Sequence, residues 1–500
     1  MASRQRTVAT LMLVGICVSS LAHAQDAPTH APAAVQNGPS AEATKPEVND
    51  HQRILELERL VRQLQEKLAS KPPAQVAPSP TPTQAPASSA PSKRLRLDES
   101  QPPFGEFDFS WLNGNNNQPS SLLTMGPLTW SIYIDAYYAW QFNAPIDHTI
   151  FPTTTAARHN EISFNLGILG VDITGLDGPL GRIYIQYGSN VETDAGQDPT
   201  VNRGYFLSAS VFKYIEQAAV GWHFHALHGI NAEIGIFPSY VGLESYLPQE
   251  NWSYTHAFLS DFTPYYFFGI RGQIFPTKRL KIELWLVNGW QTFGQWHEGR
   301  AGGYLLNWRP REWFSLVNSF YIGQEVVNDP DSLRPYTDNN VQIRYYKGRG
   351  KHTIHSAAFS LTADIGYEKR GAPVPNGWMG GLSLANRFAW TSWLATTVRG
   401  DIFYDERGSI IQQLPIGDPY KLPGKGPYLL GGFSITADVL PTPWVLFRIE
   451  YSHRESNQPY FSGHNGITGP TGIMAPFDPA FVPDFQKHDD RLIVNATLRL

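Results

Sequence analysis

The sequence predicts an all-β fold: a 16-stranded antiparallel transmembrane β-barrel, preceded by a short coiled-coil helix and a Pro-rich linker. Apolar and polar residues alternate in segments that recur from residue 128 to residue 500, and short connections between them alternate with long ones. Charged residues make up 17% of the chain, below the usual level of about 25%. The net charge of −5 and the lack of a Lys/Arg block exclude a nucleic-acid partner.

Residues 1–24 form a predicted secretory signal peptide. An apolar run follows two arginines, and Ala22-His23-Ala24 is a small-x-small cleavage site. The only cysteine, Cys17, lies within this segment, so we expect the mature protein to have neither a disulfide nor thiol chemistry. A lipid anchor on Cys17 is the alternative, which the bulky Ile16 before it disfavours.

Residues 25–48 are rich in Ala, Pro, Thr and Glu, as is typical of a disordered leader. Residues 49–71 change to a helical pattern with an a/d seam of apolar side chains: Ile54, Leu57, Val61, Leu64 and Leu68. Because two heptads are marginal alone, we expect this coiled coil to pair copies held close by an oligomeric barrel. The alternative is a single helix on the barrel or on peptidoglycan. Residues 72–103 are a Pro/Ala/Ser-rich linker, and residues 104–127 lead into the barrel at 128–500.

The strand that begins near residue 128 shows the pattern that later strands repeat. In WSIYIDAYYAWQF (130–142), Trp130, Ile132 and Ile134 share one face with further apolar residues, whereas Asp135 falls on the other. A charge on the lipid face near the midplane costs roughly 2–4 kcal/mol, so we expect the apolar face to meet lipid and Asp135 to face the lumen. A soluble barrel with an apolar interior is the alternative, and it would expose an aggregation-prone row on every strand.

The connections between the sixteen expected strands fall into two sets. The short ones lie near 175–180, 225–229, 276–279, 309–312, 347–352, 391–393 and 440–443. The long ones lie near 143–160, 191–213, 238–264, 289–300, 324–338, 369–377, 406–426 and 455–489. Such alternation of periplasmic turns with outer loops is typical of outer-membrane barrels. After the signal peptide no run of 18 apolar residues occurs, which leaves a closed barrel as the way to cross a bilayer.

A barrel of this size leaves an aqueous channel, whose narrowest part sets selectivity. By resemblance to general porins of sixteen strands, we expect loop 238–264 to fold inward and to form a constriction with its acids and aromatic residues: Glu244, Glu250, Trp252, Tyr254 and Asp261. Alternation places the following charged residues on the lumen wall: Arg182, Arg271, Arg344, Arg387, Arg399, Arg448, Asp135, Glu283 and Asp401. The alternative is a loop that folds outward or caps a subunit contact.

Five stretches are distinctive: FGEFDFSWLNG (104–114), GLDGPLGRIYIQYG (175–188), SYLPQENWSYTHAFLSDFTPYYFFGIRG (245–272), LWLVNGW (284–290) and WLATTVRGDIFYDERG (393–408). They resemble the beta-barrel porin family described as OmpL-like, over about residues 104–500. The resemblance implies an outer-membrane channel but names no solute. A coiled coil ahead of a sixteen-stranded barrel is also similar to phosphate-selective and sugar-selective porins, which implies a homotrimer.

Other constellations in the sequence are weaker. The histidines of WHFHALHG (222–229) are spaced like weak metal ligands but fall at a predicted periplasmic turn, and the acids of 328–340 match no Ca²⁺-loop spacing. The adjacent Ser and His residues at 355–356 and 452–453 point to opposite faces, which argues against an enzyme. We therefore expect no catalytic residue, no metal ligand set and no cofactor.

The predicted function is a water-filled channel for small hydrophilic solutes or ions. We expect it in the outer membrane of a Gram-negative cell, surrounded by lipid and lipopolysaccharide, with its N-terminal segment in the periplasm. The alternative is a structural or adhesive barrel that residues 107–117 or the large loops plug, and whose surface loops are the functional part. Lumen acids and bases are nearly balanced, so the sequence leaves the charge selectivity open.

Overall fold

The computed structural model describes Arg59, Gln63 and ten ranges within the barrel region: 102–118, 121–174, 176–196, 198–200, 208–295, 299–326, 329–348, 354–411, 426–469 and 478–500. The predicted signal peptide, leader and most of the linker lie outside the described residues. The same holds for the five apolar positions of the predicted coiled coil. Residues 91–500 form one compact unit, which contains the barrel.

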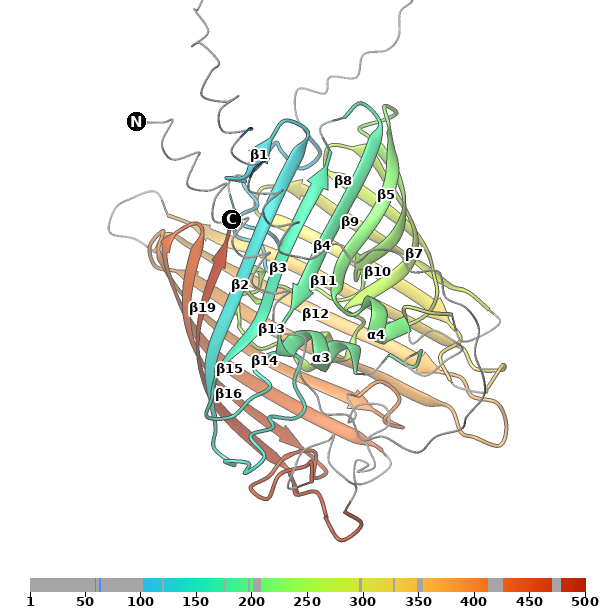
Figure 1. Ribbon diagram of the computed structural model, residues 1–500, viewed down its shortest axis with the longest axis vertical. Helices are drawn as coiled ribbons and strands as arrows, with labels where there is room; N and C mark the ends of the chain where they lie inside the picture. The colour runs from blue at the N-terminus through green and yellow to red at the C-terminus, as the bar shows by residue number, and fades with distance from the viewer. Residues whose placement is uncertain are drawn as a thin grey trace, which may run out of the picture. The chain divides into compact units, whose positions relative to one another are not determined.

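Sixteen antiparallel strands form the barrel wall (Figure 1). Their bounds are β2 (Leu128–Gln141), β3 (Ile162–Ile173), β4 (Pro179–Tyr187), β5 (Ile215–Phe224), β6 (Ile230–Pro238), β7 (Tyr266–Thr277), β8 (Leu280–Val287), β9 (Ala301–Arg311), β10 (Phe314–Gly323), β11 (Arg334–Lys347), β12 (Ser356–Glu368), β13 (Gly377–Ala389), β14 (Leu394–Asp405), β15 (Tyr428–Thr442), β16 (Val445–Ser456) and β19 (His488–Arg499). Each strand pairs with the next, and β19 pairs with both β16 and β2. The wall is therefore closed, which confirms the predicted 16-stranded antiparallel barrel.

Short elements complete the described chain. Strand β1 (Thr124–Met125) pairs with β2, and β17 (Phe461–Ser462) pairs with β18 (Phe485–Gln486). The long connections carry the helices α3 (Ser189–Ala195), α4 (Ser208–Phe212), η1 (Pro248–Glu250) and α5 (Phe258–Phe262). The helices of the described ranges are all too short and too polar to cross a membrane.

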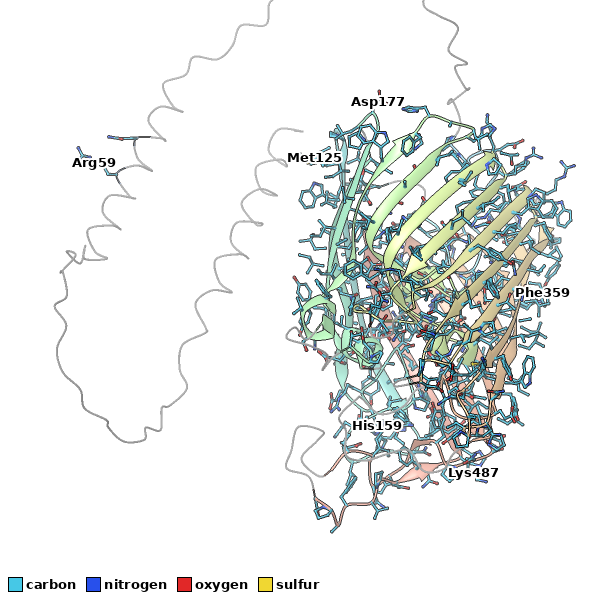
Figure 2. All side chains as sticks on the ribbon, turned by 90° about the vertical axis from the view of Figure 1, so that its right-hand side faces the viewer. Arg59, Met125, His159, Asp177, Phe359 and Lys487 are labelled. Atoms are coloured by element: carbon cyan, nitrogen blue, oxygen red, sulfur yellow. The ribbon has the colours of Figure 1, made fainter. Side chains whose placement is uncertain are left out.

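Alternation along each strand separates an apolar outer face from a polar inner face. In β2, Ile134 is 43% exposed, whereas its neighbour Asp135 is fully buried inside the barrel. Leucine, isoleucine, valine and aromatic side chains dominate the exposed set on the other strands as well, and most buried charged residues alternate with them. Side chains project from the outer surface of the wall (Figure 2). This arrangement fits a wall surrounded by hydrocarbon, because the lipid face excludes charge.

The turns and long connections gather at opposite ends of the barrel (Figure 1). The turns lie at the end near β1, and the long connections lie at the end near α3. One boundary differs from the sequence prediction. Strand β11 begins at Arg334 rather than near residue 339. The extension keeps the polar and apolar alternation, so the strand begins before the apolar row that suggested it.

Candidate functional site

Loop 238–264 connects β6 to β7 and contacts the opposite side of the strand ring. Its residues hydrogen-bond with inward side chains of β13, β14 and β16, which lie across the ring from β6 and β7. Residues 251–267 are all buried. The loop therefore bonds with the wall opposite to the two strands that it connects.

Glu450 of β16 binds the backbone of this loop. Its carboxylate accepts hydrogen bonds from the backbone N–H of Tyr254 (2.6 Å) and of Thr255 (3.0 Å), and from the hydroxyl of Thr436 in β15 (2.8 Å). Tyr254 also donates its phenolic hydroxyl to Asp135 of β2 (2.6 Å). The acid in the apolar sequence of β2 thus has a structural role: it is an inward acceptor for the loop.

Two arginines bind the carbonyl groups of the same loop. Arg399 of β14 donates to the carbonyl oxygens of Thr255 and of His256, the second at 3.0 Å. Arg448 of β16 donates to the carbonyl oxygens of Asn251 (2.7 Å) and Pro248 (3.0 Å). The guanidinium group suits this task because its five N–H donors lie in a fixed fork.

Carboxylates neutralise these arginines on the same wall. Asp438 of β15 lies 2.6 Å from Arg448 and 2.7 Å from Arg387 of β13. Glu244 of the loop lies 3.3 Å from Arg399 and accepts the backbone N–H of Ala257 at 2.7 Å. Each buried charge therefore has a partner, which is the condition for ions to persist away from water.

Three further predicted residues belong to this contact. Asp401 of β14 accepts the backbone N–H of Phe258 at 3.0 Å. Asp261 of the loop pairs with Arg454 of β16 at 3.1 Å, and Arg387 donates to the carbonyl oxygen of Trp252 at 3.4 Å. The structure thus brings four of the predicted loop residues together with five predicted wall residues: Asp135, Arg387, Arg399, Asp401 and Arg448. The fifth loop residue, Glu250, pairs instead with Arg499 of β19.

The other predicted wall residues pair elsewhere. Arg182 and Arg271 both bind Glu233 of β6, at 3.2 Å and 2.6 Å. Glu283 of β8 accepts the side-chain amide of Gln273 at 2.7 Å. Arg344 of β11 binds residues at the turn end of the barrel, Asp108 at 3.3 Å and Glu312 at 2.7 Å. These side chains line the wall, but they do not meet loop 238–264 in the contacts of the described residues.

The lead-in segment, residues 104–127, contacts loop 238–264 on the side that faces the turn end of the barrel. The backbone N–H of Gly114 donates to the carbonyl oxygen of Glu250 (3.0 Å), and the N–H of Trp252 donates to the Asn113 side chain (2.7 Å). Gly114 has φ +71°, and a Cβ there would lie 1.9 Å from the carbonyl oxygen of Leu243. Only glycine allows this approach.

A cavity of about 860 Å³ opens at the turn end, between the lead-in segment, residues 249–252 and the wall from β11 to β19. Its charged lining consists of three acids and five bases: Asp108, Glu250, Asp438, Arg344, Lys347, Arg387, Arg448 and Arg499. With His355 neutral, the difference between five and three gives the lining a net charge of +2. The lining of the cavity is thus net positive by formal charge, although the whole chain is net negative.

Two acids in the long connections, Asp194 and Glu325, have a raised pKa. Burial raises the pKa of the Asp194 carboxyl in α3 well above its usual range, and the nearby charge of Asp261 adds to this. Burial likewise raises the pKa of Glu325 to about 7. Glu325 accepts hydrogen bonds from the Tyr321 hydroxyl and the backbone N–H of Trp290.

Sequence reasoning missed parts of this contact. Alternation places Glu450 on the inner face of β16, but neither Glu450 nor Arg454 was predicted as a site residue. Arg454 lies six residues after Arg448, so the same alternation, continued over three two-residue repeats, places it inside. Asn113 and Gly114 carry no comparable signal, because their role depends on where the loop backbone passes.

The sequence and the fold were compared with known proteins. The family model described as "Putative beta-barrel porin-2, OmpL-like" matches residues 127–477. Curated protein sequences give no match. Two solved structures similar to the chain are OmpT of Vibrio cholerae (8% identity, 76% of this chain and 100% of that chain, TM-score 0.44) and the anion-selective porin from Comamonas acidovorans (7% identity, 75% and 99%, TM-score 0.44). OmpF of Salmonella typhi in complex with daunomycin is also similar (10% identity, 75% and 97%, TM-score 0.40).

The family match covers more than half of the chain and lies on the closed barrel. The apolar outer face, the polar interior and the separation of turns from long connections agree with it. The chain therefore belongs to the OmpL-like beta-barrel porin family, and it is a channel-forming barrel of the Gram-negative outer membrane.

Proposed function

We propose that this porin conducts small hydrophilic solutes along a path that loop 238–264 narrows. The observation that carries the proposal is the bonding of the loop with the far wall, through Glu450, Arg399 and Arg448. A segment fixed across the lumen leaves only the remaining cross-section for solutes. The role proposed is transport rather than catalysis.

We further propose that the channel prefers anions. The net charge of +2 on the lining of the cavity at the turn end supports this preference, because a charged wall concentrates ions of opposite sign. Arg387 is the cationic side chain best placed to test it. It lines the cavity, and its side chain is 19% exposed.

The reversal potential of single channels in a salt gradient tests this preference. We expect wild-type protein to select anions, and Arg387→Ala to lower the ratio of anion to cation permeability. Arg271→Ala is the matched control, because Arg271 pairs with Glu233 on the opposite wall and does not line the cavity. Cation selectivity in the wild type, or equal effects of both variants, would contradict the assignment.

A plugged barrel is the second candidate function, and one observation favours it. The lead-in segment contacts the underside of loop 238–264 at Gly114 and Asn113, so two segments from opposite ends of the barrel meet in the lumen. If the lead-in segment is a plug, the conductance is low until this segment leaves the lumen. Deletion of residues 104–117 separates the two candidates: a large rise in conductance supports the plug, and an unchanged conductance supports a path beside it.

We propose that copies of the chain associate through an amide patch on the outer face, in the homotrimer that the sequence suggests. Asn318 of β10 donates to the side chain of Asn339 in β11 at 2.8 Å, and Asn339 donates to the carbonyl oxygen of Ala363 at 3.1 Å. Both amides lie in an outward row of mostly apolar side chains: Asn318 follows Leu316 on β10, and Asn339 precedes Val341 on β11. Transfer of an amide side chain into hydrocarbon costs free energy. The two amides are therefore more stable in contact with the surface of another subunit than in contact with lipid.

Native mass spectrometry of the protein in detergent tests this contact. We expect the double variant Asn318→Leu/Asn339→Leu to dissociate into monomers. Asn386→Leu is the control, because this outward amide lies near the turn end of β13, where water is close. An oligomer that survives the double variant would place the subunit contact elsewhere on the wall.

A further inference from the structure

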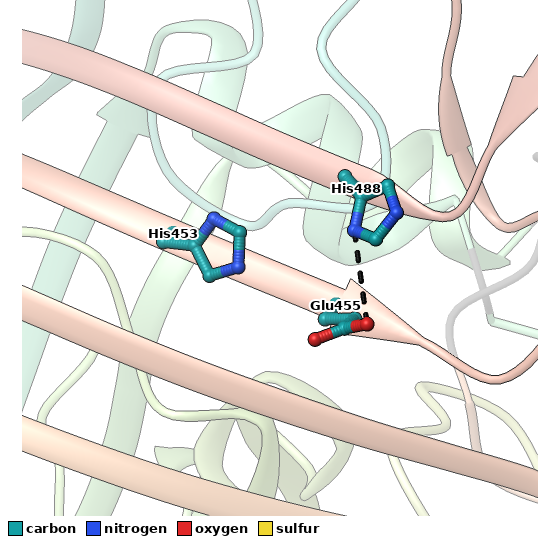
Figure 3. Close-up of side chains that lie close together, drawn as sticks. All are labelled: His453, Glu455 and His488. Atoms are coloured by element: carbon teal, nitrogen blue, oxygen red, sulfur yellow. Dashed lines mark ion pairs between the residues drawn. The ribbon is translucent and has the colours of Figure 1, made fainter.

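Two histidines and two carboxylates gather on the outer face at the loop end of β16 and β19. Figure 3 shows three of these side chains: His453, Glu455 and His488. In the strand register His453 lies opposite Asp490, and Glu455 lies opposite His488. All four side chains point outward, as Tyr451 of β16 does. They lie one or two pleats nearer to the long connections than Tyr451. The two cross-strand pairs, His453 with Asp490 and Glu455 with His488, form a square of four side chains.

The square lies beyond the apolar part of the wall. His453 and Glu455 follow Tyr451 by two and four residues, which places them roughly 7 and 13 Å further along the strand. Their side chains are 40% and 62% exposed, and that of His488 is 61% exposed. Water and dissolved ions therefore have access to these groups.

Asp490 fixes the proton position on His453. One oxygen of the Asp490 carboxylate lies 2.9 Å from Nδ1 of His453 and accepts the hydroxyl of Tyr451 at 2.6 Å. A carboxylate only accepts hydrogen bonds, so Nδ1 carries the proton and Nε2 of the neutral ring keeps its lone pair. A carboxylate behind a histidine in this way is the usual support of a metal-binding imidazole.

The remaining three side chains bring their donor atoms together. One possible ligand atom from each of His453, Glu455 and His488 lies within 4.8 Å of the others, and Nδ1 of His488 lies 3.8 Å from Oε1 of Glu455. Ligands bound to zinc at 2.0–2.2 Å lie roughly 3.4 Å apart in tetrahedral geometry. Exposed side chains can close this difference by rotation, without movement of the strands.

We propose that His453, Glu455 and His488 bind a divalent transition metal of the zinc type, with Asp490 as the positioning residue for His453. Two imidazole nitrogens and one carboxylate are a zinc ligand set that leaves a coordination position for water. Two nitrogen ligands disfavour Mg²⁺ and Ca²⁺, which prefer oxygen. The bound ion joins β16 to β19 at the base of the last long connection, residues 457–487.

Calorimetric titration of the full chain with Zn²⁺ tests the proposal, using protein purified in detergent without a histidine tag. We expect one saturable equivalent per chain. His453→Gln and His488→Gln should each lower the affinity at least tenfold, and Asp490→Asn should lower it by a smaller factor. His464→Gln is the control, because this exposed histidine bonds with the carbonyl oxygen of Ala144 outside the square and should leave the affinity unchanged.

Two further readouts separate the site from unspecific binding. Co²⁺ bound by the wild type should give the visible absorption of a low-coordinate nitrogen and oxygen site, which His488→Gln should abolish. Excess Mg²⁺ should not displace Zn²⁺. The proposal is overturned if Zn²⁺ does not saturate, if His453→Gln and His488→Gln bind as the wild type does, or if Mg²⁺ competes at equal concentration.

Discussion

Replacement of Glu450 tests how loop 238–264 is held across the lumen. The carboxylate accepts the backbone N–H groups of Tyr254 and Thr255 while fully buried. Glu450→Gln keeps the shape but removes the charge and turns one acceptor oxygen into an N–H donor that faces another donor. A buried hydrogen bond to a charged group contributes about 1.5–3 kcal/mol, and an unsatisfied buried N–H costs about 1–3 kcal/mol. We therefore expect local opening of the loop to become easier by about 3 kcal/mol, roughly 150-fold in its equilibrium constant.

Thiol labelling measures this opening directly. Ser253 lies next to the contact and is 1% exposed, and the only natural cysteine, Cys17, falls in the predicted signal peptide. In a Ser253→Cys background, a water-soluble thiol reagent reacts only when the loop opens. Glu450→Gln should raise the labelling rate by about two orders of magnitude.

Glu283→Gln is the matched control for this experiment. Glu283 is also buried and also accepts hydrogen bonds, but from Gln273 and Trp285 on the near wall. It should leave the labelling rate of Ser253→Cys unchanged. Equal labelling rates in the wild type and in Glu450→Gln would show that Glu450 does not hold the loop. An equal rise in both glutamine variants would also contradict this role, because the effect would then be a general loosening of the barrel.

Three further predictions concern other parts of the molecule. Gly114→Ala should release the lead-in segment, because its Cβ would meet the carbonyl oxygen of Leu243 at 1.9 Å, and chymotrypsin should then cut after the Phe, Trp and Leu residues of 104–117, which it should spare in the wild type. Arg448→Ala should remove one donor from two loop carbonyl groups and leave Asp438 with Arg387 as its remaining cation, and it should lower the thermal unfolding temperature in detergent more than Arg182→Ala does. For Glu325, the pKa of about 7 in the folded protein exceeds the usual 4.5, so its contribution to stability, on the order of 3 kcal/mol, is present at low pH and lost as the pH rises through 7. Glu325→Gln should flatten the unfolding temperature between pH 5 and pH 8.5 relative to the wild type, and an unchanged slope would remove Glu325 as its source.

The barrel was predictable from the sequence because lipid imposes a rule with period two on every strand. Asp135 shows how strong this rule is: one acid among apolar neighbours suffices to identify the inner face. The same rule assigns the inward direction of Arg399 and Arg448. The boundary error at β11 falls where the hydrogen-bonded strand begins before the apolar row does.

The partners of the inward residues were not predictable in the same way. Alternation places Arg271 and Arg399 on the same inner face, but only the path of loop 238–264 decides that Arg399 meets its carbonyl groups and that Arg271 pairs with Glu233. This path depends on contacts between residues more than 100 positions apart, such as Tyr254 with Asp135 and with Glu450. A pattern within one strand carries no information on such pairs. The docking of Gly114 against the loop is a further example.

The current through single proteins in a planar bilayer shows whether solutes pass through this barrel. We predict steady, ohmic conductance of purified protein in symmetric salt, with a conductance that rises when Glu450→Gln frees loop 238–264 from the far wall. Silence in bilayers of several lipid compositions, both for the wild type and after deletion of residues 104–117, would contradict an open path through this barrel.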